Sequence, residues 1–183
     1  MAHLRGAPTP QQSSGIVSPE QDTRRWVQDF VVGLGLCPFA APVLAEGRAM
    51  FLTCPEDSVE LAFYWAGAQV QELLSQPPSE VDTSLLIFPE VLADFGDFLD
   101  FIAEIEDLLQ ASGADEWVQL AHFHPRYCFG GVPEEDPANA TNRSPYPTVQ
   151  LLRVESVAKA IARFPGAKSI PDRNMALLRK RAT

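Results

Sequence analysis

The sequence lacks long hydrophobic runs, and it has few cysteines and comparatively few basic residues. No stretch approaches the roughly 18 apolar residues that a membrane helix needs, and the N-terminal segment has no apolar core of the kind found in secretory signals. Three cysteines, Cys37, Cys54 and Cys128, without a CxxC motif argue against a disulfide framework. These absences predict a soluble protein located in the cytoplasm.

Basic residues number 14 against 24 acidic ones, which gives a net charge of -10 and a pI near 4.7. Such a surface repels phosphate backbones and anionic lipids, so we expect neither nucleic acid nor membrane as a partner. A local basic pocket could still bind a small anion. Arg126, Arg143 and Arg153 fall in or beside one polar segment and are candidates for such a pocket.

What the sequence does have is a hydrophobic fraction of 46%, enough for one globular core. Residues 1–17 are rich in Pro, Gln and Ser and are predicted to be a disordered tail, and residues 18–183 to form a single globular domain. Apolar periodicity predicts helices over 19–35, 59–76, 90–112, 155–164 and from 171 onward, and strands over 48–54, 83–88, 118–123 and 148–153.

Strands interleaved with helices indicate an α/β (α+β) fold, with an approximately four-stranded sheet packed with helices. About two dozen residues separate the last two predicted strands. A connection of this length allows the last strand to return antiparallel to its predecessor, which would make the sheet mixed. Long loops in compact domains are usually functional or disordered, and this one is crowded with aromatic and hydrogen-bonding side chains. We therefore predict that it carries the functional site.

His124 lies where the third predicted strand ends and the loop begins, which is where α/β folds usually bind ligands. An imidazole there can act as general acid or base, and Tyr127 and the Cys37 thiol are further catalytic candidates. The alternative is that His124 only fixes the strand end and the loop. His122 and His124 point to the same face of a strand and could bind a divalent transition metal together with Cys128 and Asp136.

Arg143 and Arg153 could hold a carboxylate or phosphate between them. Asn142, Ser144 and Tyr146 supply amide, hydroxyl and phenol groups that could orient such a substrate. The alternative is a self-organised loop, in which Asn and Ser bond the turn backbone and Arg143 pairs with one of the acids at 134–136.

Four motifs together resemble a known family: LCPFA at 36–40, FHPxYxF at 123–129, TNRSPYP at 141–147 and LLR at 151–153. The chain is similar to the family catalogued as domain of unknown function 1415, over about residues 19–181. It departs from that family's pattern at three positions, since Gln150 replaces the usual His, His122 replaces a small residue, and Val154 replaces Glu. The resemblance therefore implies a divergent member and leaves the activity open.

The leading hypothesis is a small soluble enzyme that acts on a small anionic molecule. Its site would lie at 124–153, with His124 transferring a proton and the two arginines holding the anion. Neither the reaction nor a cofactor is specified, and a metal-assisted mechanism is the variant. The alternative is a non-catalytic protein that uses the same loop to bind a small ligand or a protein partner, as an accessory protein would.

Overall fold

One mixed four-stranded sheet, ordered β1-β2-β4-β3, organises the computed structural model, which describes residues 18–182. β1 runs parallel to β2, whereas β4 is antiparallel to both β2 and β3. The predicted α/β class and mixed sheet are thus confirmed, and the long loop does return the last strand antiparallel. The predicted tail at 1–17 lies outside the described residues. The strands are β1 (Ala49–Thr53), β2 (Thr83–Ile87), β3 (Val118–Phe123) and β4 (Thr148–Arg153).

Six α-helices and four shorter helical turns, η1 to η4, make up the helical part of residues 18–182. None of the described helices is long and apolar enough to cross a membrane. The α-helices are α1 (Pro19–Trp26), α2 (Ala40–Ala45), α3 (Val59–Ser75), α4 (Phe95–Ser112), α5 (Val154–Arg163) and α6 (Ile170–Arg181). The turns are a π-helical η1 (Val27–Val32) and the 3-10 turns η2 (Ala114–Glu116), η3 (Pro137–Asn142) and η4 (Ala167–Ser169).

The structure corrects two predicted helix boundaries and adds one helix. Ser18 caps α1, which begins at residue 19 as predicted, but the helix predicted to run to residue 35 widens into η1 and ends at Val32. The helix predicted from residue 90 begins only at Phe95, because Leu92 has a positive φ of 65° and Asp94 caps the next turn. The short α2, inside the segment after the first helix, was not predicted.

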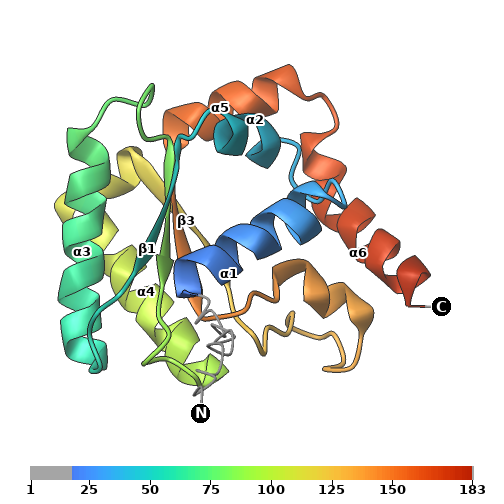
Figure 1. The fold of residues 1–183 in the computed structure, drawn as a ribbon, viewed down its shortest axis with the longest axis horizontal. Helices are drawn as coiled ribbons and strands as arrows, with labels where there is room; N and C mark the ends of the chain where they lie inside the picture. Colours follow the sequence, from blue (N-terminus) through green and yellow to red (C-terminus); the bar gives the residue numbers. More distant parts are fainter. Residues whose placement is uncertain (1–17, 183) are drawn as a thin grey trace, which may run out of the picture.

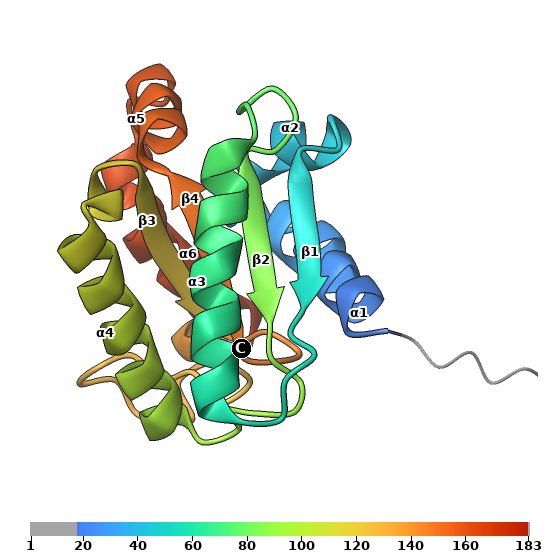
Figure 2. The ribbon, with the colours of Figure 1, turned by 90° about the vertical axis from the view of Figure 1, so that its left-hand side faces the viewer.

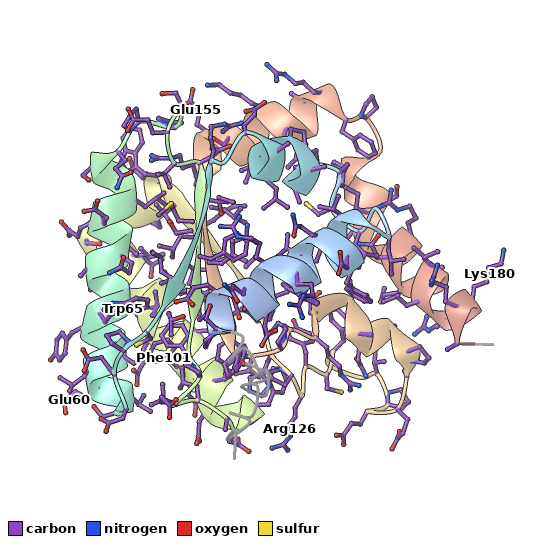
Figure 3. All side chains as sticks on the ribbon, in the orientation of Figure 1. Glu60, Trp65, Phe101, Arg126, Glu155 and Lys180 are labelled. Carbon is purple, nitrogen blue, oxygen red and sulfur yellow. The ribbon has the colours of Figure 1, made fainter. Side chains whose placement is uncertain are left out.

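The sheet separates two helical layers (Figures 1 and 2). Figure 1 shows it nearly edge-on, with α3 and α4 on one side and α1, α2, α5 and α6 on the other. The α3–α4 side holds the larger core, in which Trp65 and Phe101 pack edge-on against Phe88 (Figure 3). Each fully buried side chain of this kind, such as Phe88 or Phe98, stabilises the folded state by roughly 2–3 kcal/mol.

Strand register assigns each sheet residue to one of these two sides. Leu52, Leu86, Val149 and His122 are cross-strand neighbours and form one row toward α3 and α4. Because side chains alternate along a strand, rows one or three positions away face the opposite layer. Two such rows run across β1, β2, β4 and β3, one as Ala49, Thr83, Leu152 and Gln119, the other as Phe51, Leu85, Gln150 and Ala121.

Candidate functional site

A pocket of about 730 Å³ lies on the α1 side of the sheet. Its walls come from α1 and η1, from α2 and the turn before it, from all four strands of the sheet, and from one face of α5. Most lining side chains are apolar. The main apolar ones are Trp26, Val27, Val31, Leu36, Phe39, Val43, Phe51, Leu85, Ala121, Phe123, Leu152, Val157 and Phe164.

The pocket exists because the helical layer fills only half of this sheet face. Over β1 and β2, Val27 packs with Phe51 and Leu85 in a small second core. Over β4 and β3 the sheet presents the short Ala121 and the polar Gln150, which leave a hollow. α5 borders that hollow but has no buried residue of its own, so its inward face closes the space without filling it.

Cys37 is held at the pocket wall by α6. Asn174, which is buried, donates to the Leu36 carbonyl at 2.8 Å, and Arg173 donates to the Gly35 carbonyl at 2.6 Å. Gly35 supplies the positive φ of 64° that this turn requires. Cys37 was expected merely to follow a helix, whereas the structure shows that it also precedes α2. Of the catalytic candidates, it alone lines the pocket.

Gln150 and Thr83 form the polar floor of the pocket. The Gln150 Nε2 donates to Thr83 Oγ1 at 3.0 Å, and the Thr83 hydroxyl donates to the Leu151 carbonyl at 2.7 Å. Gln150 was noted from the sequence only as a departure from the family pattern. Its place in the pocket depends on strand register, which the sequence did not reveal.

The charged side chains that line the pocket are mostly basic. They are Arg48, Arg153, Lys159 and Arg163, against the single acid Asp82. Arg48 is paired, because its guanidinium meets Glu46 and Asp82 at 2.6 and 2.7 Å. Lys159 pairs only with the exposed Glu155, and an exposed pair of this kind is weak. Within residues 18–182, Arg163 makes no ion pair.

Arg153, predicted to bind an anion, instead caps the C-terminal end of α3. Its Nε donates to the Val81 carbonyl at 3.0 Å, and its Nη2 to the Leu73 and Gln76 carbonyls at 2.6 Å each. The side chain is buried, and desolvation lowers its pKa. Its hydrogen-bonding capacity is thus directed at the backbone, although the residue does touch the pocket.

His124 lies on the α4 side, away from the pocket, with its ring fully buried between Phe95 and Phe98. Nδ1 accepts from the Arg126 amide at 3.0 Å, so the ring proton is on Nε2, which donates to the Leu92 carbonyl at 3.0 Å. Burial lowers the pKa of this imidazole. The arrangement fits the structural alternative, since both nitrogens are occupied and no substrate can reach them.

His122 also faces α4, so the two histidines share a side as their spacing predicted. Its ring contacts Phe98, and Tyr127 Oη lies 3.4 Å from its Nε2. Burial lowers the pKa of His122 and raises the pKa of Tyr127. Tyr127 itself packs on Phe95, so this pair belongs to the wall between loop and helix rather than to an open site.

The remaining loop candidates mainly hold the loop together. Arg143 donates to the Tyr127 and Glu134 carbonyls at 3.1 and 2.9 Å, and Ser144 to the Tyr146 carbonyl at 2.5 Å. Tyr146 donates to Asp22 at 3.3 Å, which anchors the loop to α1. Burial raises the pKa of its phenol. Only Asn142 borders the pocket, while its amide reaches the His122 carbonyl at 3.3 Å.

The proposed metal ligands do not converge. Asp136 caps η3 and forms a two-pronged ion pair with Arg179 of α6, which holds the pKa of this carboxyl below its usual range. Cys128 points its thiol at the Val132 carbonyl, 3.3 Å away. Within residues 18–182, no group of three or more His, Cys, Asp and Glu side chains is arranged to hold a metal ion.

The structure therefore brings Cys37, Asn142 and Arg153 to one pocket and leaves the other candidates in the loop frame or against α4. The residues that sequence reasoning missed are Gln150 as a pocket residue, Thr83, and the α5 cations Lys159 and Arg163. One signal was available for α5, because residues 153, 156, 157, 160, 163 and 164 recur at helical spacing and all line the pocket.

Comparison with protein-family models shows which family the chain resembles. A family model described as "Protein of unknown function (DUF1415)" covers residues 18–183, nearly the whole chain. No curated protein and no solved structure matches.

Proposed function

The chain belongs to this family of unknown function, and we propose that it binds a small organic anion with an apolar body in the pocket beside α5. The observation that carries the proposal is the pairing of an apolar cavity with a basic lining in an acidic protein. The proposed site lies on the side of the sheet opposite His124, and it keeps from the first expectation the anionic ligand and the residues Asn142 and Arg153.

The size and shape of the cavity support a small ligand. Small-molecule pockets typically enclose about 300–1,000 Å³, are mostly apolar, and carry a few well-placed polar groups. The volume of about 730 Å³ falls in this range, with Phe51, Leu85 and Val157 among its apolar walls and Gln150 as a polar group on the floor.

The charges at the pocket support a negative ligand. Four of the five charged lining residues are basic, although acids outnumber bases 24 to 14 in the chain. Arg163 and Lys159 stand one helical turn apart on α5, where their cations can meet a carboxylate or sulfonate at the rim. The apolar body would then lie against Trp26 and Phe51.

A catalytic version of this proposal rests on Cys37, the one cysteine that lines the pocket. A thiol there could attack a bound electrophilic ligand. No imidazole of residues 18–182 assists it, because His124 is sealed on the other side of the sheet and His122 packs on Phe98. All three cysteines are free, which fits the reducing cytoplasm that we propose as the location.

The proposal is tested with anilinonaphthalene sulfonate, a fluorescent apolar anion, titrated into the purified chain. We expect one site, roughly tenfold weaker in Ala121→Trp, which fills the hollow over β3, and roughly threefold weaker in Arg163→Ala. Ala158→Trp and Lys168→Ala are the matched controls, since neither residue lines the pocket. Equal affinities in Ala121→Trp and wild type would place the probe elsewhere and overturn the proposal.

A further inference from the structure

The Gln150–Thr83 pair on the pocket floor has a fixed hydrogen-bond direction. Side-chain amides can usually be turned by 180°, so their oxygen and nitrogen are assigned from their partners. Here the partners decide. Thr83 has one hydroxyl proton, and it must point to the Leu151 carbonyl, because this obligate acceptor lies 2.7 Å from Oγ1 and the two oxygens would repel each other without a proton between them. Thr83 Oγ1 can therefore only accept, and the Gln150 atom 3.0 Å from it must be the NH2 group.

Because the NH2 group of this amide faces Thr83, its carbonyl oxygen, Oε1, is available as an acceptor in the pocket. No residue within 18–182 donates a hydrogen bond to this oxygen. Its cross-strand neighbours on this face are Leu85 and Ala121, which have no polar side-chain atoms to offer. Gln150 Oε1 is thus a directed acceptor that lies between two apolar cross-strand neighbours.

We propose that Gln150 is a specificity-determining residue that selects anions carrying a hydroxyl or N–H donor on their apolar body. A ligand with that donor satisfies Oε1, whereas a ligand without it covers a polar oxygen with apolar atoms. Leaving a buried acceptor unpaired is costly, so the site discriminates between ligands that differ only in this group. Thr83 acts as a positioning residue, because it prevents the amide from turning its donor toward the ligand.

This inference rests on the proposed function but can fail separately from it. The probes are phenylpropanoate, its ortho, meta and para hydroxy derivatives, and the corresponding methoxy derivatives, each measured by displacement of anilinonaphthalene sulfonate. In the wild type, at least one hydroxy isomer should bind roughly fivefold to tenfold more tightly than phenylpropanoate, which is the effect of one well-placed hydrogen bond. The methoxy derivative of that isomer, which cannot donate, should lose the advantage.

Variants of the floor give the sharper test. Gln150→Leu should bind phenylpropanoate at least as well as wild type and lose the preference for the hydroxy isomer. Gln110→Leu, the same change on the exposed side of α4 and outside the pocket lining, should keep the preference. Thr83→Val frees the amide to turn, so the methoxy derivative should gain on the hydroxy isomer, and Thr83→Ser should restore the wild-type order.

The outcomes separate the two proposals. If no acid displaces the fluorescent anion from wild type, both the anion pocket and the inference fall. If the acids bind but no hydroxy isomer exceeds phenylpropanoate, or the preference survives Gln150→Leu, the inference alone is overturned. Should Thr83→Val not fold, the comparison of Gln150→Leu with Gln110→Leu still decides.

Discussion

The loop of residues 124–147 and the wall of the pocket differ in how much of their hydrogen-bonding capacity is already used. In the loop, Arg143 donates to two backbone carbonyls, and the buried Asn139 accepts from one amide and donates to two carbonyls. In the pocket wall, Gln150 keeps a free acceptor and Arg163 has no ion pair within residues 18–182. The loop has more polar side chains, but it is the pocket that has Gln150 and Arg163, whose polar groups are still available to a ligand.

This difference teaches that residue type alone does not locate a site. An uncommonly polar loop can be polar because it lacks a regular backbone ladder and must satisfy its buried carbonyls and amides with side chains. His124, Asn139 and Arg143 form hydrogen bonds of this kind. They thereby fix the position of Asn142 at the edge of the pocket. The loop is thus a frame for one corner of the site.

The strongest test of this comparison is His124→Ala. The change removes a fully buried ring and both of its hydrogen bonds, and leaves a cavity between Phe95 and Phe98. We expect unfolding to become easier by about 4 kcal/mol, which lowers the Tm by roughly 8–16 °C in a domain of this size. Calorimetry measures the melt, and an anilinonaphthalene sulfonate titration at low temperature measures the pocket.

If the loop is a frame, the folded part of His124→Ala still binds the anion, with an affinity close to that of wild type. A normal melt together with lost binding would reverse the comparison, because it would assign His124 to the ligand rather than to the fold.

Arg153 and Arg163 both border the pocket, but Arg153 stabilises the fold through its hydrogen bonds, whereas Arg163 is available to a ligand. Arg153→Ala leaves three backbone carbonyls without their donor, two at the end of α3 and one just before β2, and should cost about 3 kcal/mol, or roughly 6–12 °C in Tm. Arg163→Ala should change the Tm by no more than about 1 °C, since the residue is exposed and unpaired within residues 18–182. The roles would be exchanged if Arg163→Ala lost stability and Arg153→Ala lost only affinity.

Mild acid should lower the stability of the fold through two histidines, His122 and His124, before it affects the ion pairs. Burial lowers the pKa of both His122 and His124, so the unfolded chain, with histidines near pKa 6.5, binds more protons than the folded one. Stability is therefore full above about pH 6.5 and is lost as the pH falls below it. Urea unfolding at pH 7 and pH 5.5 measures the loss, and His124→Gln, which cannot titrate, should show a smaller one. An equal loss in both proteins would argue against this role of His124.

Most of the fold could be predicted because it follows from local patterns. The four strands coincide with short apolar runs, and the predicted helix start at residue 19 and helix end at residue 112 agree with the caps Ser18 and Gly113. The exceptions are also local in cause. The start of α4 shifts to Phe95 because Leu92 adopts a left-handed conformation, which no sequence rule favours for leucine.

The site could not be predicted in the same way, because the pocket is assembled by contacts between distant segments. Gln150 meets Thr83 only through the register of β2 against β4, and Cys37 reaches the wall only because Asn174 holds the preceding turn. Sequence reasoning found Cys37 and the family motifs. It could not tell that the histidines face away from the pocket, because both sides of the sheet are covered by helices and either side was open to them.

The smallest expected effect compares two cysteines, one from each region, in a single experiment. Cys37 lines the pocket, Cys128 lies in the loop with its thiol 3.3 Å from the Val132 carbonyl, and Cys54 is buried. Bound anilinonaphthalene sulfonate should slow iodoacetamide labelling of Cys37 by roughly threefold or more, by limiting access to the thiol. The rate at Cys128 should stay unchanged, as mass spectrometry of the peptides can show. Equal protection of both cysteines would mean that the ligand tightens the whole protein, and the division between frame and pocket would no longer hold.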